Sequence, residues 1–192
     1  MKKILFLMLT LAVSVLLSYG VSFIFKANIF NIHEFGFQFV MFSVVGSLMY
    51  FSLKFMSIRN TLAILFVITT IFTFVYKSTS MMQVVGNLQM LYLYLVLLFI
   101  SLAFVMKLIL FNEKFRMMRN LSFSITATLG YTFVHIIINL IIKTQISGSL
   151  FLSYFKNGFV IMLTLGAAFI VTEIIYSKIA GDEVMYEEEE DN

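Results

Sequence analysis

Cysteine and proline are absent from the 192 residues of the chain. Without cysteine there can be no disulfide, no thiolate nucleophile and no cysteine-ligated metal site. Without proline the chain lacks the Pro-interrupted helices at which many alternating-access transporters bind solute, and it shows no internal repeat. A self-sufficient carrier is therefore less favoured than a subunit that depends on other proteins.

Charged residues are also scarce. They make up 12% of the chain, whereas 61% of the residues are hydrophobic, which is far outside the range of soluble proteins. The apolar runs do not alternate with polar residues as the strands of a membrane barrel do, and backbone groups in lipid must be bonded within a segment. The composition therefore predicts an all-α, polytopic membrane protein embedded in the lipid bilayer.

Acidic residues are almost confined to the C-terminus. Only Glu34, Glu113 and Glu173 precede it, and they lie far apart near the ends of apolar runs. His33 and His135 have no obvious carboxylate to orient them as bases, and no hydrolase, NTPase or dinucleotide-binding motif occurs. We therefore expect no enzyme activity, no metal, no cofactor and no nucleic-acid partner, and the lack of deep acids disfavours an ion pump.

Six stretches are apolar over about 20 residues, the length that crosses a hydrocarbon core of about 30 Å. They are residues 4–25, 35–53, 61–76, 88–110, 121–142 and 151–176. Because the connections are short, sequential helices should pack as antiparallel neighbours in one bundle. We expect a six-helix transmembrane domain over residues 1–178 and a disordered acidic cytoplasmic tail over residues 179–192.

The first apolar run also fits a signal peptide, because Lys2 and Lys3 precede it and Ser18-Tyr19-Gly20 fits a cleavage site. The run continues beyond that site to Phe25, which gives it spanning length. We therefore expect it to be retained as the first membrane helix.

Basic residues indicate the orientation of the six spans. Nine lie on one side: Lys2, Lys3, Lys54, Arg59, Lys107, Lys114, Arg116, Arg119 and Lys178. Four lie on the other: Lys26, Lys77, Lys143 and Lys156. The more positive side of a membrane protein faces the cytoplasm. We therefore expect both termini inside, in the cytoplasmic (inner) membrane of a prokaryote.

The fifth apolar run carries a stripe of polar residues. At about 100° per residue, its polar positions fall within an arc of about 80° on one face of a helix. They are Ser124, Thr128, Tyr131, His135 and Asn139. Lipid offers no partner to an imidazole or a carboxamide, so this face should turn into the bundle. The candidate ligand-binding residues are Tyr131, His135 and Asn139 of this stripe, with Gln89 and Asn157 from other spans.

Two interpretations of this polar stripe stay open. Ser and Thr in membrane helices often bond to their own backbone, and His and Asn often bridge neighbouring helices at about 0.6–2 kcal/mol each. Alternatively, the stripe and the outer loops converge on one outward-facing pocket for a small polar solute. Most of the uncharged amide and imidazole groups lie in the outer half of the protein, whereas purely structural contacts should be spread through the bundle. This asymmetry favours the pocket.

The first apolar run has a ridge of small residues. Thr10, Ser14, Ser18 and Ser22 recur every four residues, a pattern that lets two helices pack closely. We call Ser14, Ser18 and Ser22 the serine ridge. The ridge serves either a neighbouring helix of the same bundle or a partner protein.

In length, span number, orientation, first-helix ridge and polar outer half, the chain resembles the substrate-binding membrane subunits of energy-coupling-factor vitamin transporters. The resemblance implies a solute pocket and docking of the first helix to a coupling protein, with Ser14 and Ser18 in place of that family's small alanines. The chain also resembles small multi-pass scaffold proteins of envelope-building machines, such as the rod-shape-determining membrane protein, whose role is assembly.

Two functions therefore compete. The first is a non-catalytic, solute-binding subunit of a transporter, with an outward-facing pocket around Tyr131, His135 and Asn139. The second is a structural or assembly subunit of a larger membrane complex, in which the same groups hold helices together. Both functions imply the lipid bilayer and other membrane protein subunits as partners, and the first adds a small polar solute. A cavity lined by the stripe would favour the first, and a packed outer half the second.

Overall fold

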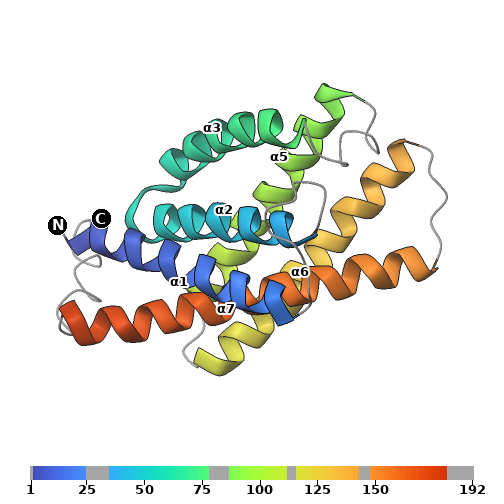
Figure 1. The fold of residues 1–192 in the computed structure, drawn as a ribbon. Helices are drawn as coiled ribbons and strands as arrows, with labels where there is room; N and C mark the ends of the chain where they lie inside the picture. The colour runs from blue at the N-terminus through green and yellow to red at the C-terminus, as the bar shows by residue number, and fades with distance from the viewer. Residues whose placement is uncertain (1, 25–34, 78–86, 112–115, 143–147, 181–192) are drawn as a thin grey trace.

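The computed structural model describes residues 2–24, 35–77, 87–111, 116–142 and 148–180. Over these residues the chain is helical and has no strand, which confirms the predicted all-α class (Figure 1). The helices are α1 (Lys2–Ile24), α2 (Phe35–Phe55), α3 (Ile58–Tyr76), α5 (Leu88–Val105), the π-helix η1 (Met106–Leu110), α6 (Arg116–Ile141) and α7 (Gly148–Ala180). The predicted acidic tail lies outside the described residues from residue 181 onward.

Among the described residues, five helical segments are long and apolar enough to cross a membrane. They are Lys2–Ile24, Ile58–Val75, Leu88–Leu110, Arg119–Ile141 and Gly148–Ile179. The apolar segment of α2, Phe39–Phe55, is shorter than these five. Segments of this length and composition indicate an integral membrane protein.

Polar side chains mark the starts of two helices. Ser57 accepts a hydrogen bond from the backbone N–H of Asn60 at 3.4 Å and begins α3. Asn87 accepts one from the backbone N–H of Met90 at 2.8 Å and begins α5. Only Met56 and Ser57 separate α2 from α3, so the chain turns back on itself there and the two helices pack together.

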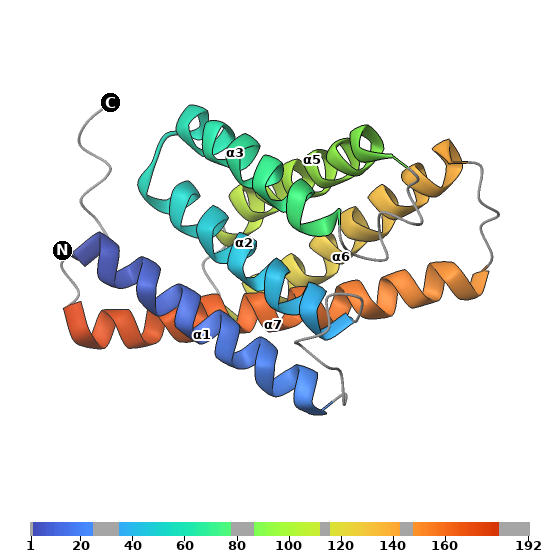
Figure 2. The same ribbon diagram turned by 45° about the horizontal axis from the view of Figure 1, so that its top comes forward.

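The helices form one bundle in which α1 packs against both α2 and α7 (Figures 1 and 2). Helix α6 packs against α7 and α5, and α3 packs against α5 and α2. The start of α1 lies beside the end of α7, and the centres of the Phe6 and Tyr176 rings are 5.0 Å apart. The end of α2 joins them through Phe55, whose ring lies 5.3 Å from Phe6. We call this part of the bundle the terminal end.

Large apolar side chains cover the outside of the bundle, whereas hydroxyl groups are buried between the helices. Phe23 of α1 and Phe133 of α6 are 76% and 63% exposed. Ser43 and Ser47 of α2 and Thr172 of α7 are completely buried. Exposed rings are unfavourable in water and favourable in lipid, while small hydroxyl-bearing residues let membrane helices approach one another.

Glycine allows α6 and α7 to lie close together. A Cβ atom on Gly158 of α7 would lie 2.7 Å from Cδ1 of Tyr131 on α6. A Cβ atom on Gly166 would collide with the side-chain oxygen of Asn120. These two positions bring α7 directly onto the face of α6 that carries the polar stripe.

Candidate functional site

The polar stripe of α6 faces the interior of the bundle. All five of its members are buried: Ser124, Thr128, Tyr131, His135 and Asn139. Ser124 and Thr128 donate to the carbonyls four residues earlier, at 2.7 and 2.6 Å. Asn139 donates to the carbonyl of His135 at 2.8 Å. Much of the stripe's hydrogen-bonding capacity is therefore used within its own helix.

His135 uses both ring nitrogens. Its Nδ1 lies 2.8 Å from the carbonyl oxygen of Tyr131, and because a carbonyl only accepts, Nδ1 carries the proton and donates it. In the neutral ring Nε2 is then an acceptor, and the hydroxyl of Tyr94 on α5 donates to it at 2.9 Å. The imidazole thus joins α6 to α5 and has no nitrogen left for a ligand.

Three tyrosine rings surround the imidazole. The ring of Tyr131 lies 4.1 Å from it, that of Tyr154 on α7 lies 4.5 Å away, and that of Tyr94 lies 5.2 Å away. Asn139 donates a further hydrogen bond to the hydroxyl of Tyr154 at 3.1 Å. We call Tyr94, Tyr131, His135, Asn139 and Tyr154 the His135 cluster. The His135 cluster connects α5, α6 and α7 through hydrogen bonds and ring contacts.

The other two candidate ligand residues lie apart from each other. Gln89 is exposed in the first turn of α5 and lines a cavity of about 280 Å³ between α3 and α5. The other lining residues are Thr70, Thr73, Phe74, Leu88 and Tyr92, none of which belongs to the His135 cluster. Asn157 is half-buried on α7, next to the glycine that packs on Tyr131. The structure therefore brings together Tyr131, His135 and Asn139, with Gln89 at a separate cavity.

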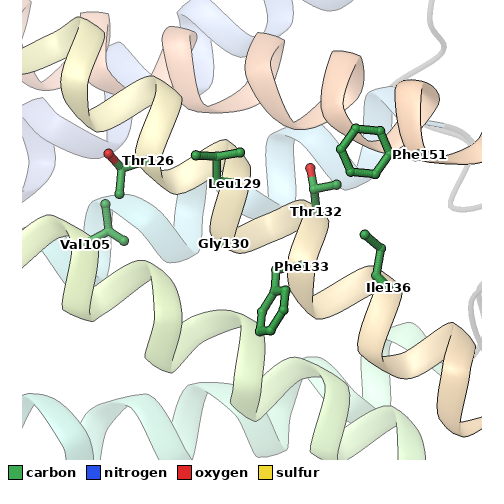
Figure 3. A pocket seen from close by; sticks show the side chains of 8 residues that line it. All are labelled: Val105, Thr126, Leu129, Gly130, Thr132, Phe133, Ile136 and Phe151. Atoms are coloured by element: carbon green, nitrogen blue, oxygen red, sulfur yellow. The ribbon is translucent and has the colours of Figure 1, made fainter. Parts of the chain in front are cut away.

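A second cavity, of about 460 Å³, opens on the outward face of α6 (Figure 3). Figure 3 shows Val105 of α5 and Phe151 of α7 at its edges, with the rest of the lining on α6. Leu129 and Phe133, which are 52% and 63% exposed, belong to this lining. The lining has no charged residue and no member of the His135 cluster. Its chemistry suits lipid or another apolar surface more than a polar solute.

A charged cluster lies at the terminal end. Glu173 of α7, which is 9% exposed, is the only carboxylate in the part of the chain that the structure describes. One carboxylate oxygen pairs with Nη2 of Arg119 on α6 at 2.5 Å. The other accepts a hydrogen bond from the hydroxyl of Tyr50 and lies 4.0 Å from Nζ of Lys54, both on α2. We call Tyr50, Lys54, Arg119 and Glu173 the Glu173 network.

The surroundings of the Glu173 network involve further helices. Nζ of Lys54 lies 4.7 Å from the centre of the Phe6 ring of α1, a cation–π distance. Nη1 of Arg119 donates a hydrogen bond at 3.3 Å to the backbone carbonyl of Leu110, the last residue of η1. Carbonyls at the end of a helix lack an intrahelical donor, and Arg119 supplies one here. The ring of Tyr50 stacks on Phe169 of α7 at 4.3 Å. One ionic cluster therefore connects α1, α2, η1, α6 and α7.

The sequence carries a signal for this network. Glu173 lies near the end of the sixth apolar run, and Lys54 and Arg119 lie near the ends of the second and fifth runs on the same predicted side. An acid inside an apolar run normally pairs with a cation. Glu173, Lys54 and Arg119 are therefore candidates for an ion pair, because all three lie near the same membrane face. Which cation pairs with Glu173 depends on how α2, α6 and α7 pack, and spacing along one helix does not reveal that.

The serine ridge of α1 faces α2. Ser18 shares a hydrogen bond with Ser43 of α2, and the hydroxyl of Ser47 donates to the carbonyl of Thr10 at 3.4 Å. The hydroxyls of Ser14 and Ser22 are buried without a hydrogen-bond partner among the described residues. The ridge therefore supports close packing of α1 on α2 within the chain.

The chemistry of the two clusters differs. The His135 cluster is neutral and lacks a carboxylate, while the Glu173 network has one carboxylate held by three donors. Within residues 2–24, 35–77, 87–111, 116–142 and 148–180, no group of three or more His, Asp or Glu side chains is placed to hold a metal ion. No protein-family model, curated protein or solved structure matches the chain.

Proposed function

We propose that the chain is a non-catalytic structural subunit of a membrane complex, with six membrane spans and both termini in the cytoplasm. Helix α2 is the sixth span, because its 21 residues extend over about 30 Å at 1.5 Å per residue. The proposed location is the cytoplasmic membrane of a prokaryote.

The distribution of cations supports this orientation. Seven of the described basic residues belong to the terminal end. Lys2, Lys3, Lys54 and Lys178 lie on the helix ends of α1, α2 and α7 that meet there, and Arg59 follows in the first turn of α3. Arg119 pairs with Glu173, and Lys107 lies over Phe111, whose ring stacks on Tyr50. Lys77 at the end of α3 and Lys156 near the start of α7 lie at the opposite end. Because positive charge favours the cytoplasmic side, the terminal end is the cytoplasmic one in this proposal.

The observation that carries the structural role is the internal bonding of the His135 cluster. A solute pocket needs polar groups that water or a ligand can reach. Both nitrogens of His135 already have protein partners, and Asn139 bonds to α7 as well as to its own helix. His135 and Asn139 are each only 5% exposed. The imidazole of His135 and the amide of Asn139 therefore support helix association.

Partner subunits would meet the outer surface of the bundle. The serine ridge already packs on α2, so docking of a partner on the ridge would require α1 to leave its neighbour. Outward faces such as that of α6 carry the exposed apolar side chains that another membrane protein could cover.

A second candidate function, the solute-binding subunit, is favoured by the cavity at Gln89. The amide of Gln89 and the hydroxyl of Tyr92 are the groups there best suited to a small polar solute, because Thr70 and Thr73 donate to their own backbone at 2.9 and 2.7 Å. The cavity lies near the end of the bundle that faces outward in the proposed orientation.

Thermal melting of the detergent-solubilised protein with a panel of polar solutes tests the two functions. The structural role predicts that no solute raises the melting temperature, and that His135→Ala melts earlier than the wild type with or without solutes. A solute that stabilises the wild type and His135→Ala but not Gln89→Ala would establish the second function instead. Phe133→Ala is the matched control on α6, because this side chain points outward.

A further inference from the structure

The terminal end of the bundle is a concentrated basic surface. Its seven cations come from α1, α2, α3, η1, α6 and α7, and ring contacts hold several of them in one region. Lys3 lies over Phe55 at 5.5 Å, Lys54 over Phe6 at 4.7 Å, and Lys107 over Phe111 at 5.5 Å. Figure 2 shows the start of α1, which carries Lys2 and Lys3, beside the end of α7, which carries Lys178.

Very little of this positive charge is compensated by the described residues. Glu173 is the single carboxylate that the structure describes, and both Arg119 and Lys54 already share it. The remaining five cations, Lys2, Lys3, Arg59, Lys107 and Lys178, are exposed and form no ion pair with another described residue. Like charges gathered on one face repel each other and create a strong field for an anionic partner.

The chain itself carries such an anion next to this surface. Helix α7 ends at Ala180, and the sequence that follows is GDEVMYEEEEDN. It contains seven of the ten acidic residues of the protein and no basic residue. The acidic segment therefore follows directly on the helix that carries Lys178, and its charge is complementary to that of the basic surface.

We propose that the acidic segment 182–191 binds back onto the basic surface of the terminal end. The segment forms ion pairs with the exposed lysines and Arg59, and it shields these residues from other anions, including the headgroups of acidic lipids. The proposal goes beyond the structural role and does not depend on it, because it concerns only the charges at one end of the bundle.

The geometry permits this contact. The run Glu187–Glu190 begins seven residues after Ala180, and a chain of that length has a root-mean-square span of roughly 13–16 Å. Lys54 and Arg119 meet Glu173, which precedes the end of α7 by seven residues, or about 10 Å along the helix axis. Lys178 precedes that end by two residues, and the first turns of α1, which carry Lys2 and Lys3, reach the end of α7 through the contact between Phe6 and Tyr176. Covalent attachment also gives the segment an effective concentration of the order of millimolar.

The absence of cysteine makes a distance measurement straightforward. One spin label is attached at Asn60→Cys, an exposed position of α3 at the terminal end, and a second at Asn192→Cys. Pulsed electron paramagnetic resonance then reports the distance between the basic surface and the acidic segment in the full-length protein. In uncharged detergent at low salt we expect a population of short distances. We expect its loss in 1 M salt, where the Debye length is about 3 Å, and its loss when Glu187–Glu190 are changed to glutamine.

Matched lysine variants identify the surface that binds the segment. Changing Lys2, Lys3 and Lys178 together to glutamine should abolish the short distances, whereas changing Lys77 and Lys156 to glutamine should leave them intact. Equal distributions for all these proteins would overturn the proposal. In bilayers that mix phosphatidylcholine and phosphatidylglycerol we expect the short distances to persist. If the short distances disappear in that mixture but remain in pure phosphatidylcholine, the basic surface binds lipid headgroups in place of the segment. That result would also overturn the proposal.

Discussion

Replacing Glu173 by glutamine should be among the most damaging single changes in this protein. The substitution keeps the shape of the side chain but leaves Arg119 and Lys54 facing each other without the carboxylate that neutralises them. Removing one partner of a buried ion pair costs about 3–5 kcal/mol. Because the Arg119 side chain is 13% exposed and retains some hydration, we expect the lower part of this range, about 3 kcal/mol.

The other members of the Glu173 network should give a graded series. Lys54→Gln should cost less than about 1 kcal/mol, because Lys54 lies 4.0 Å from the carboxylate and its side chain is 21% exposed. Tyr50→Phe removes one donor to a charged acceptor and should cost about 1.5 kcal/mol. The double variant Glu173→Met with Arg119→Met should be more stable than Glu173→Gln, because it removes the unpaired arginine together with the acid.

Unfolding free energies from titration with a denaturing detergent test this series, and thermal melting offers a second measurement. A loss of about 3 kcal/mol corresponds to a fall of roughly 6–12 °C in melting temperature for a protein of this size. A cost of Glu173→Gln no greater than that of Lys54→Gln would show that the carboxylate does not neutralise a buried Arg119. A double methionine variant less stable than Glu173→Gln would show the same.

Three further predictions concern topology and packing. Reporter fusions at the two termini should both give cytoplasmic signals, and an external C-terminus would contradict the six-span proposal. Ser14→Leu with Ser18→Leu should lower the melting temperature far more than Ala12→Leu, which adds the same kind of bulk on the exposed face of α1; equal effects would show that the ridge is not a packing surface. Gly158→Ala should cost about 1–3 kcal/mol because its methyl group would press on Tyr131, whereas Gly148→Ala, which has open space around it, should be nearly neutral.

Much of the helical layout could be predicted from the sequence, because hydrophobic length is a local property. The fourth apolar run was predicted over residues 88–110, and the structure divides this range into α5 and η1 without moving its ends. Helices α6 and α7 extend beyond their predicted runs to Arg116 and Ala180. Polar residues can extend a helix beyond the hydrocarbon core, and a search for apolar runs does not detect these extensions.

The polar stripe was likewise predictable as a face, but its partners were not. The period of the helix places Tyr131, His135 and Asn139 on one side, and lipid excludes them from the outside. Whether that face meets a ligand or a protein depends on which residues other helices bring to it. Tyr94 and Tyr154, which lie 41 and 19 residues from His135 in the sequence, complete the cluster through packing of α5 and α7.

A double-mutant cycle between Tyr94 and His135 measures how strongly the polar groups of α6 hold the helices together. The cycle compares unfolding free energies of the wild type, Tyr94→Phe, His135→Phe and the double variant. The hydrogen bond between the tyrosine hydroxyl and Nε2 predicts a favourable coupling energy of about 0.6–2 kcal/mol. A coupling energy indistinguishable from zero, with unchanged stability of both single variants, would contradict the structural role of the His135 cluster.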